Sequence, residues 1–355
     1  MIPKHKHTQK LCMNIKRQIS ILKAQIEEEK KKRKTGKGGG WLVEKHGAAQ
    51  ITLIGFTNSG KSSLISTVTN AKPPVSNYPY STVEPAVGML PYQDIYFQLV
   101  EAPSLQPTLE ETSWNLKILG LVRNADGIIL VLDLQEDTSQ QFKLLKRILE
   151  DSKIFVEKPR GRVVIDRRAD GLGVQVVGKL LDATHEDVKN LLNSYKIYNA
   201  TVKVYGEATL NDVEEAVFGG VQYKPTLIVA NKFDSENLKE KLKTLEAEVN
   251  GKLKILPVSC RTGKNLEKLG EEIFGLMEIL RVYTKHPSKK EPSTEPIILR
   301  KGATVLDVAK EIHSQLYEKF WYAKVWGSSA KYSGERVGGD HVLADKDIIE
   351  IHTRK

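Results

Sequence analysis

The sequence predicts an α/β fold in which a mostly parallel sheet is covered by helices on both faces. Short apolar strands alternate with amphipathic helices over most of the chain, a pattern typical of parallel sheets. A glycine-rich turn lies between the first of these strands and the helix behind it. The rhythm is interrupted near the middle and again near the C-terminus, which predicts an inserted unit and a separate terminal domain.

The central unit is expected to span residues 48–284. It starts with the buried strand Ala48–Ile54, and a helix begins at about Ser62 behind the glycine-rich turn. The other expected strands are Ile95–Val100, Gly127–Leu134, Thr226–Ala230 and Lys254–Val258, and the other expected helices are Trp114–Arg123, Ser139–Asp151, Asn237–Val249 and Leu266–Leu280.

Residues 156–221 break the alternation and predict a small α/β insertion. Arg162–Asp166 and Gly173–Val177 flank Ala169-Asp170-Gly171, a turn sequence that favours a hairpin. Two helix starts follow, each with a capping residue three positions before a carboxylate. These pairs are Thr184 with Asp187 and Asn211 with Glu214.

Residues 294–355 are expected to form the terminal domain, behind the polar linker Lys285–Pro296. A helix laid across a small mixed sheet is a ubiquitin-like or β-grasp pattern. Three aromatic side chains in it could stack on bases, but in so small a domain they more simply fill the core. The expected elements are strands Ile297–Leu299, Ala323–Val325 and Ile348–Ile351 with helix Val305–Leu316, and the aromatics are Trp321, Tyr322 and Trp326.

Residues 1–47 predict a basic helical segment. The chain has a net charge of +10, and residues 1–48 hold 13 Lys or Arg against 4 Glu, so most of the excess lies there. A basic arm is attracted to polyanions such as RNA, although it could also be a solvated helix. Its apolar residues recur at spacings of three and four, which puts them on one helical face. They are Leu11, Ile15, Ile19, Leu22 and Ile26.

Several classes of protein are disfavoured. The chain has no apolar run near the ~20 residues of a membrane span, so no membrane partner is expected. Its lysine-rich start is not followed by the apolar stretch of a secretory signal. The two cysteines, Cys12 and Cys260, lack spaced histidines for zinc and fit a reducing compartment. We therefore expect a cytoplasmic protein.

The glycine-rich turn matches the phosphate-binding pattern G-x-x-x-x-G-K-[ST] over residues 55–62. Glycines let the backbone wrap around phosphates and aim its N–H groups at them. Lys61 is expected to reach the β- and γ-phosphates, and the Ser62 hydroxyl to bind Mg²⁺. The predicted phosphate-loop residues are Gly55, Thr57, Asn58, Ser59, Gly60, Lys61, Ser62 and Ser63.

A second motif, N-K-x-D, follows the strand Thr226–Ala230 and predicts guanine as the base. The Asp234 carboxylate can accept hydrogen bonds from guanine N1–H and the exocyclic amine, which adenine does not offer. Asn231 is expected to brace the phosphate loop, and the Lys232 stem to cover the base. A backbone N–H in Ser259-Cys260-Arg261, which follows the strand Lys254–Val258, can meet guanine O6.

Together these residues resemble the developmentally regulated GTP-binding protein subfamily of the Obg-like GTPases. The likeness extends to Leu191–Ala200 in the insertion. In the terminal domain, three stretches are similar to parts of a TGS domain, namely Lys301–Ala309, Asp340–Leu343 and Asp347–Ile349. The resemblance implies a P-loop G domain, GTP hydrolysis with Mg²⁺, stimulation by K⁺, and work near the ribosome or RNA. It also leaves room for a regulatory protein partner.

The resemblance gives catalytic roles to three residues. Lys61 is one. Asn58 matches the asparagine that helps to hold K⁺ beside the phosphates in potassium-activated relatives, although asparagine also simply tolerates a tight turn. Thr82 matches the switch threonine that joins the Mg²⁺ shell, with Ser81 as its rival.

The chain departs from the family where Asp-x-Pro-Gly is expected, because Glu101-Ala102-Pro103-Ser104 stands there. Glu101 could still hold the Mg²⁺ shell with a shifted geometry, whereas Ser104 lacks the conformational freedom of glycine. Leu105 stands where Ras-type enzymes carry a water-positioning glutamine, and Gln106 is a weak substitute. Two hypotheses follow, an active GTPase or a slow, GTP-bound adaptor that docks on RNA or the ribosome.

Overall fold

The structure is a computed structural model that describes residues 41–71, 84–108, 112–168, 171, 173–217, 222–287 and 291–354. Residues 1–40 of the basic segment, which carry its apolar stripe, and the switch residues Ser81 and Thr82 lie outside the described residues, and residues 41–46 form no helix. No helix in the described part of the chain combines the length and apolarity needed to cross a membrane.

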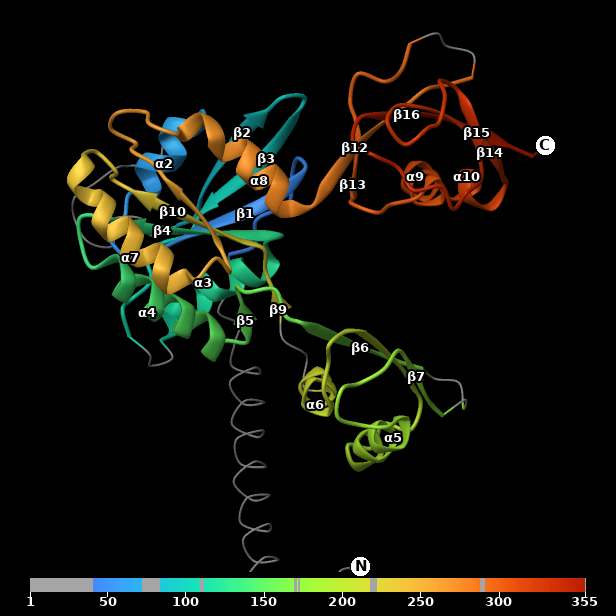
Figure 1. Cartoon of the computed structure of the whole chain (residues 1–355), viewed down its shortest axis with the longest axis horizontal. Coiled ribbons are helices and arrows are strands. Elements are labelled where there is room, and N and C mark those ends of the chain that lie inside the picture. The colour runs from blue at the N-terminus through green and yellow to red at the C-terminus, as the bar shows by residue number, and fades with distance from the viewer. Residues whose placement is uncertain are drawn as a thin grey trace, which may run out of the picture. The chain divides into compact units, whose positions relative to one another are not determined.

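The central unit contains a six-stranded sheet in the order β11-β10-β4-β1-β3-β2 (Figure 1). All neighbouring strands run parallel except β2 and β3, which form an antiparallel hairpin. The predicted parallel sheet is confirmed, and no end of its five predicted strands moves by more than one residue, whereas the antiparallel edge strand β2 was not predicted. The strands are β1 (Ala49–Ile54), β2 (Ala86–Tyr92), β3 (Ile95–Glu101), β4 (Gly127–Asp133), β10 (Thr226–Asn231) and β11 (Lys254–Pro257).

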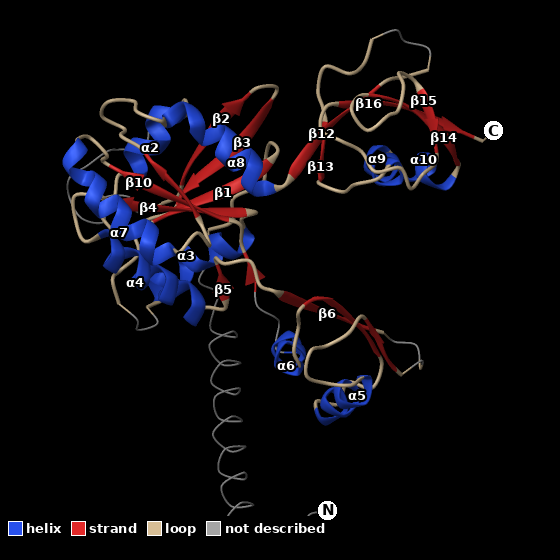
Figure 2. Ribbon diagram, viewed as in Figure 1, coloured by secondary structure: helices blue, strands red, loops and turns tan. Residues whose placement is uncertain are grey.

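Helices cover both faces of this sheet (Figure 2). α2 and α8 pack on one face in a core that includes Leu64, Ile65 and Ile273 beside Leu53 and Leu99. α3, α4 and α7 lie across the other face. The helices are α2 (Lys61–Val68), α3 (Ser113–Asn124), α4 (Thr138–Asp151), α7 (Lys239–Val249) and α8 (Leu269–Met277), and the short 3₁₀ turns η1 (Glu236–Leu238) and η2 (Leu266–Lys268) precede α7 and α8.

The insertion is an α/β unit as expected, but its strand order corrects the predicted hairpin. β6 and β7 do not pair with each other, because β8 lies between them, antiparallel to β6 and parallel to β7. β8 takes the central place because Ala200, Val202 and Val204 are all buried in the core of the unit. The elements are β6 (Gly161–Arg167), β7 (Val174–Val177), α5 (His185–Ser194), β8 (Ala200–Gly206) and α6 (Leu210–Val217), with β5 (Ile154–Phe155) and β9 (Gln222–Tyr223) pairing where the insertion leaves and rejoins the sheet.

The first helix start of the insertion is confirmed and the second is wrong by two residues. Thr184 and Asp187 form a reciprocal capping box at α5. At α6 the equivalent bonds join Thr209 to Asp212, with the Thr209 N–H 2.7 Å from Asp212 Oδ2. Threonine offers a hydroxyl that both donates and accepts, which fits this exchange of hydrogen bonds.

The C-terminal unit has a five-stranded mixed sheet in the order β13-β12-β16-β14-β15. Its core combines sheet residues with Val305 and Val308 of α9. The helix expected over Leu266–Leu280 ends at Met277, because Glu278 adopts a left-handed φ of 48° and a strand begins at the next residue. The elements are β12 (Ile279–Thr284), β13 (Ile297–Arg300), α9 (Val305–Ile312), α10 (Ser314–Glu318), β14 (Phe320–Trp326), β15 (Glu335–Val337) and β16 (Asp347–Thr353).

The three predicted aromatic residues of this unit do not belong to its core, contrary to the simpler expectation. Trp321, Tyr322 and Trp326 are absent from the buried cluster, and Trp321 is 52% exposed. Because strand residues alternate between faces, Tyr322 and Trp326 share the face opposite the buried Ala323 and Val325.

A buried arginine joins β12 to the turn between β2 and β3. The Arg281 side chain is 2% exposed and donates to Gln93 Oε1 at 2.7 Å, Asp94 Oδ1 at 2.5 Å and Asp345 Oδ2 at 2.6 Å. Its guanidinium also lies 4.8 Å from the Phe274 ring centroid. These contacts offset the cost of burying the charge.

Arg281→Met should therefore lower the stability of the folded chain. Asp94 and Asp345 would lose their shared cation, but they keep side-chain exposures of 27% and 34%. We expect a loss of about 2 kcal/mol, less than for a fully buried charge, and a melting temperature lower by roughly 5 °C. Thermal unfolding measures it, with Arg300→Met on the exposed side of β13 as the control. Equal melting temperatures for the two variants would contradict this assignment.

Candidate functional site

The predicted site residues meet at one edge of the central sheet. β1, β3, β4, β10 and β11 are parallel, so their carboxyl ends lie together, and the two nucleotide motifs and Glu101 lie at or directly behind these ends. This edge is the usual ligand-binding position in open α/β sheets. The topology thus brings together residues up to 206 positions apart in sequence, from Gly55 to Arg261.

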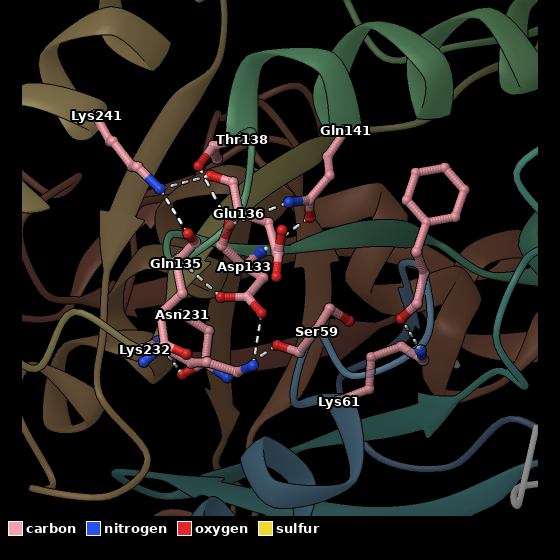
Figure 3. Close-up of polar contacts among 11 residues, drawn as sticks. Ser59, Lys61, Asp133, Gln135, Glu136, Thr138, Gln141, Asn231, Lys232 and Lys241 are labelled. Carbon is pink, nitrogen blue, oxygen red and sulfur yellow. Dashed lines mark hydrogen bonds and ion pairs between the residues drawn. The ribbon is translucent and has the colours of Figure 1, made fainter. Parts of the chain in front are cut away.

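The phosphate loop is held in shape by close backbone contacts. Gly60 has a φ of 88°, and a Cβ there would lie 2.1 Å from Asn231 Nδ2, so no other residue fits. Asn58 is exposed and has a φ of 62°, a left-handed conformation that asparagine tolerates. Asn231 Nδ2 donates to the Ser59 carbonyl oxygen at 3.0 Å (Figure 3). This bond is the bracing contact expected between the two motifs.

Lys61 lies at the first position of α2 with its ammonium in the loop. Its Nζ donates to the carbonyl oxygens of Gly55 at 3.1 Å and Phe56 at 3.0 Å, and to Ser104 Oγ at 3.0 Å. The residue is 4% exposed. Burial lowers the pKa of Lys61 to about 8, while the nearby Glu101 charge acts in the opposite direction. The site therefore contains a desolvated cation, which an incoming phosphate would stabilise.

Ser62 and Glu101 lie beside this cation. The Ser62 hydroxyl donates to Glu101 Oε1, and Glu101 is 1% exposed at the end of β3. Burial raises the pKa of Glu101, against the hydrogen bond from Ser62 and the charge of Lys61. Within the described part of the chain, Glu101 Oε2 is buried without a hydrogen-bond partner. A buried carboxylate oxygen next to a serine hydroxyl is the donor set that Mg²⁺ prefers.

The described residues contain no second cluster of side chains that could hold a metal ion. No group of three or more His, Cys, Asp or Glu side chains converges among the described residues. Ser62 and Glu101 alone would thus give Mg²⁺ two protein contacts, which suits an ion that is also held by substrate phosphates and water. The third predicted ligand, Thr82, lies outside the described residues.

The segment behind Glu101 is buried against the loop. Ser104 is 9% exposed and its hydroxyl accepts the bond from Lys61. Leu105 is fully buried, and its N–H donates to the Gly55 carbonyl oxygen at 3.2 Å. The Gln106 backbone is tied to the Asn115 side chain through two hydrogen bonds. The serine that replaces glycine is thus part of the phosphate site.

The base-reading residues also come together. The Asp234 carboxylate is 12% exposed, accepts from the Ser259 hydroxyl at 2.5 Å and lies 3.1 Å from Arg261 Nη2. Cys260 is partly buried, and burial raises the pKa of its thiol to about 11, so it stays protonated at neutral pH. Asp234, Ser259 and Arg261 form one contact group as the motif order predicted, and their roles toward a base stay predictions.

The remaining predicted residues, Thr57 and Ser63, are half-buried in the loop and the first turn of α2.

One residue that contacts this site was not identified from the sequence. Asp133, at the end of β4, lies 2.5 Å from Lys232 Nζ (Figure 3). The sequence does contain a signal for it, because Asp133 is a carboxylate at the end of an apolar strand, at the sheet edge where ligands bind.

The buried ammonium leads to a pH-dependent prediction. If phosphates keep Lys61 protonated, binding GDP at pH 8 should take up about half a proton, because a group with a pKa near 8 is then half deprotonated. Uptake should fall to about a tenth of a proton at pH 7. Calorimetry in buffers of different ionisation enthalpy measures this. Lys61→Met is the control, and uptake that persists in it would assign the proton to another group.

This geometry is that of a P-loop nucleotide-binding protein, and comparisons with known proteins agree. Residues 50–164 match the family described as 50S ribosome-binding GTPase, residues 169–279 the C-terminal region of the same domain, and residues 280–353 the TGS domain. The chain is 34% identical to an uncharacterized GTP-binding protein of Methanocaldococcus jannaschii, over 98% of this chain and 88% of the relative.

It is also 30% identical to developmentally-regulated GTP-binding protein 2 of Mus musculus, over 98% of this chain and 94% of that protein. The chain belongs to the developmentally regulated GTP-binding protein family. The YchF GTPase of Schizosaccharomyces pombe has a similar fold, with a TM-score of 0.50 and 15% identity over 88% of this chain and all of that structure.

Proposed function

We propose that the protein hydrolyses GTP with Mg²⁺ and is stimulated by K⁺, in the cytoplasm and near the ribosome or RNA. The observation that carries this proposal is the convergence of Lys61, Ser62, Glu101, Asn231 and Asp234 at one sheet edge. Phosphoryl transfer of this class depends on positioning and charge stabilisation more than on covalent chemistry. The site offers both.

Different residues of the site would bind the phosphates, the metal ion and the base. The phosphate-loop backbone and Lys61 would hold the phosphates, and Asn231 keeps the loop in place through Ser59. Ser62 and Glu101 would hold Mg²⁺, directly or through water. The metal, when bound, neutralises charge on the phosphate oxygens. Asp234 would accept the guanine donors, so that base and phosphates are fixed at opposite ends of the site.

K⁺ stimulation rests on Asn58, whose side-chain oxygen is a ligand type that K⁺ accepts. The left-handed φ of 62° offers a purely conformational reason for asparagine at the same position. GTP turnover with Mg²⁺ in KCl and in NaCl at equal ionic strength, with ATP as a control, tests the proposal. Faster turnover of GTP in KCl supports it. Absence of GTP turnover in both salts would overturn it in favour of an adaptor.

The adaptor hypothesis is favoured by one specific observation. Glu101 and Ser104, which replace the family's aspartate and glycine, contact Ser62 and Lys61. Both phosphate-site side chains are thereby tied to the segment that should move between nucleotide states. A protein of this kind would bind GTP tightly and release the phosphate slowly.

Glu101→Asp with Ser104→Gly should therefore raise the turnover rate roughly tenfold, with GTP affinity nearly unchanged. The shorter carboxylate and the freer backbone would both ease movement of this segment. Single-turnover kinetics measure it. Ser104→Ala is the matched variant, because it removes the bond to Lys61 without adding backbone freedom. An unchanged rate in the double variant would rule out slow hydrolysis caused by these two residues.

Contact with RNA is supported by the open face of the C-terminal sheet. Arg336 lies over the Tyr322 ring at 3.8 Å and near Trp321 at 5.2 Å, and Lys285 lies 4.6 Å from the Trp326 ring. Trp321 is exposed, whereas Tyr322 and Trp326 are half-buried, and an exposed ring beside a cation suits stacking on a single-stranded base. Quenching of tryptophan fluorescence by single-stranded RNA, compared between the natural chain and Trp321→Ala, tests this part of the proposal.

A further inference from the structure

A second carboxylate lies at the base end of the site and has no assigned role. Asp133 ends β4 and pairs in register with Asn231, the last residue of the neighbouring parallel strand β10. The next residue, Lys232, has a left-handed φ of 64°, and its Nζ lies 2.5 Å from Asp133 Oδ2. The lysine side chain therefore runs from the base-reading motif back to the neighbouring strand.

The Asp133 carboxylate is itself fixed. Its side chain is 9% exposed, and its other oxygen accepts the Gln135 N–H at 2.8 Å. The Asp133 N–H donates to Gln141 Oε1 at 3.0 Å, and its carbonyl oxygen accepts from Gln141 Nε2 at 3.1 Å and from Thr138 Oγ1 at 3.2 Å (Figure 3). Because this network holds the Asp133 carboxylate in place, the Lys232 ammonium can pair with it in one position only.

The loop that carries these bonds is also tied to α7. Lys241 Nζ donates to the carbonyl oxygens of Gln135 at 2.5 Å and Glu136 at 3.0 Å. The start of α4, the end of β4 and the helix behind the base motif thus form one hydrogen-bonded unit. Movement of Asp133 away from Lys232 would have to break several of these bonds.

We propose that Asp133 is a positioning residue for base recognition, acting through Lys232. A free lysine samples many rotamers, and ordering it when a base binds costs affinity. The ion pair orders the stem of Lys232 in advance, so that its methylene groups form a preformed wall against the plane of a guanine base. This inference rests on the proposed guanine-nucleotide function of the same site.

Asp133→Asn should raise the dissociation rate of a fluorescent GDP analogue roughly fivefold, the effect of leaving one long side chain unordered. Affinity for inorganic triphosphate, measured by competition, should stay the same, because triphosphate uses the phosphate loop and not the base wall. Glu136→Gln is the matched control, because Glu136 is an exposed carboxylate in the same loop. It should change neither the dissociation rate of the GDP analogue nor the affinity for triphosphate.

A double-mutant cycle decides whether Asp133 acts through Lys232. In a Lys232→Met background, which keeps an aliphatic stem but no ammonium, Asp133→Asn should have no further effect. Additive losses, or equal weakening of GDP and triphosphate, would overturn the positioning role. If the natural chain fails to bind the GDP analogue at all, the proposed function fails instead, and that result is seen before any variant is made.

Discussion

Asp234→Asn should exchange a preference for guanine nucleotides for a preference for xanthine nucleotides. The carboxylate offers two acceptors to the N1–H and exocyclic amine of guanine, and both of its oxygens lie in a polar group with Ser259 and Arg261. Asparagine offers one acceptor and one donor. The asparagine NH₂ group would then face the exocyclic amine of guanine, so that two donors meet. Xanthine has a carbonyl oxygen in place of this amine and can accept from the NH₂ group.

The expected loss is large because a charged acceptor of two hydrogen bonds is replaced in a site that is 12% exposed. Two charge-assisted bonds contribute about 4 kcal/mol together, which corresponds to a roughly thousandfold weaker affinity for GDP. Equilibrium binding of GDP and XDP measures the exchange. Glu240→Gln on the exposed side of α7 has the same charge change and should leave both affinities unaltered. Equal weakening of GDP and XDP would show that Asp234 supports the fold and does not read the base.

The sequence was sufficient for the parts of this site in which residue identity determines local geometry. Gly60 must be glycine because of its positive φ and its approach to Asn231, so the loop motif predicted both the turn and its bracing contact. The buried strands of the central sheet were found because each is a short apolar run between turn signals. These features depend on neighbours within a few residues or on a motif whose geometry is constant.

The errors concern pairings between distant segments and one helix end set by an unusual residue. The turn sequence Ala169-Asp170-Gly171 predicts a hairpin between β6 and β7, whereas β8, which comes later along the chain, lies between them. The start of β12 was missed because a left-handed glutamate at position 278, not glycine or proline, ends the preceding helix. Asp133 was missed because its partner lies 99 residues away and only the strand order places them together.

Lys61→Met should separate stability from function at the phosphate site. Methionine fills the space of the lysine stem but has no charge, so nucleotide binding loses its buried cation. Removing one member of a buried charge pair costs about 3 kcal/mol or more, and we expect GDP affinity to fall at least a hundredfold.

The same substitution should make the protein without nucleotide more stable. A lysine pKa lowered from 10.5 to about 8 means that burying the ammonium costs about 3 kcal/mol at neutral pH. Because the folded chain releases this proton more readily than the unfolded chain, the cost is fully present below pH 8 and is relieved between pH 8 and 10.5. Lys61→Met removes the cost, although the oxygens of Gly55, Phe56 and Ser104 lose a donor.

We therefore expect a net gain of about 1 kcal/mol at pH 7 that shrinks toward pH 10, measured by urea unfolding at both values. Lys241→Met, which also removes a lysine with two carbonyl partners, is the matched control from the base side of the site, and it should not gain stability at pH 7. A destabilised Lys61→Met variant would mean that its three hydrogen bonds outweigh the desolvation of the ammonium. A stabilised variant that no longer binds GDP would show that the buried Lys61 ammonium destabilises the protein without nucleotide, and that bound phosphate offsets this destabilisation.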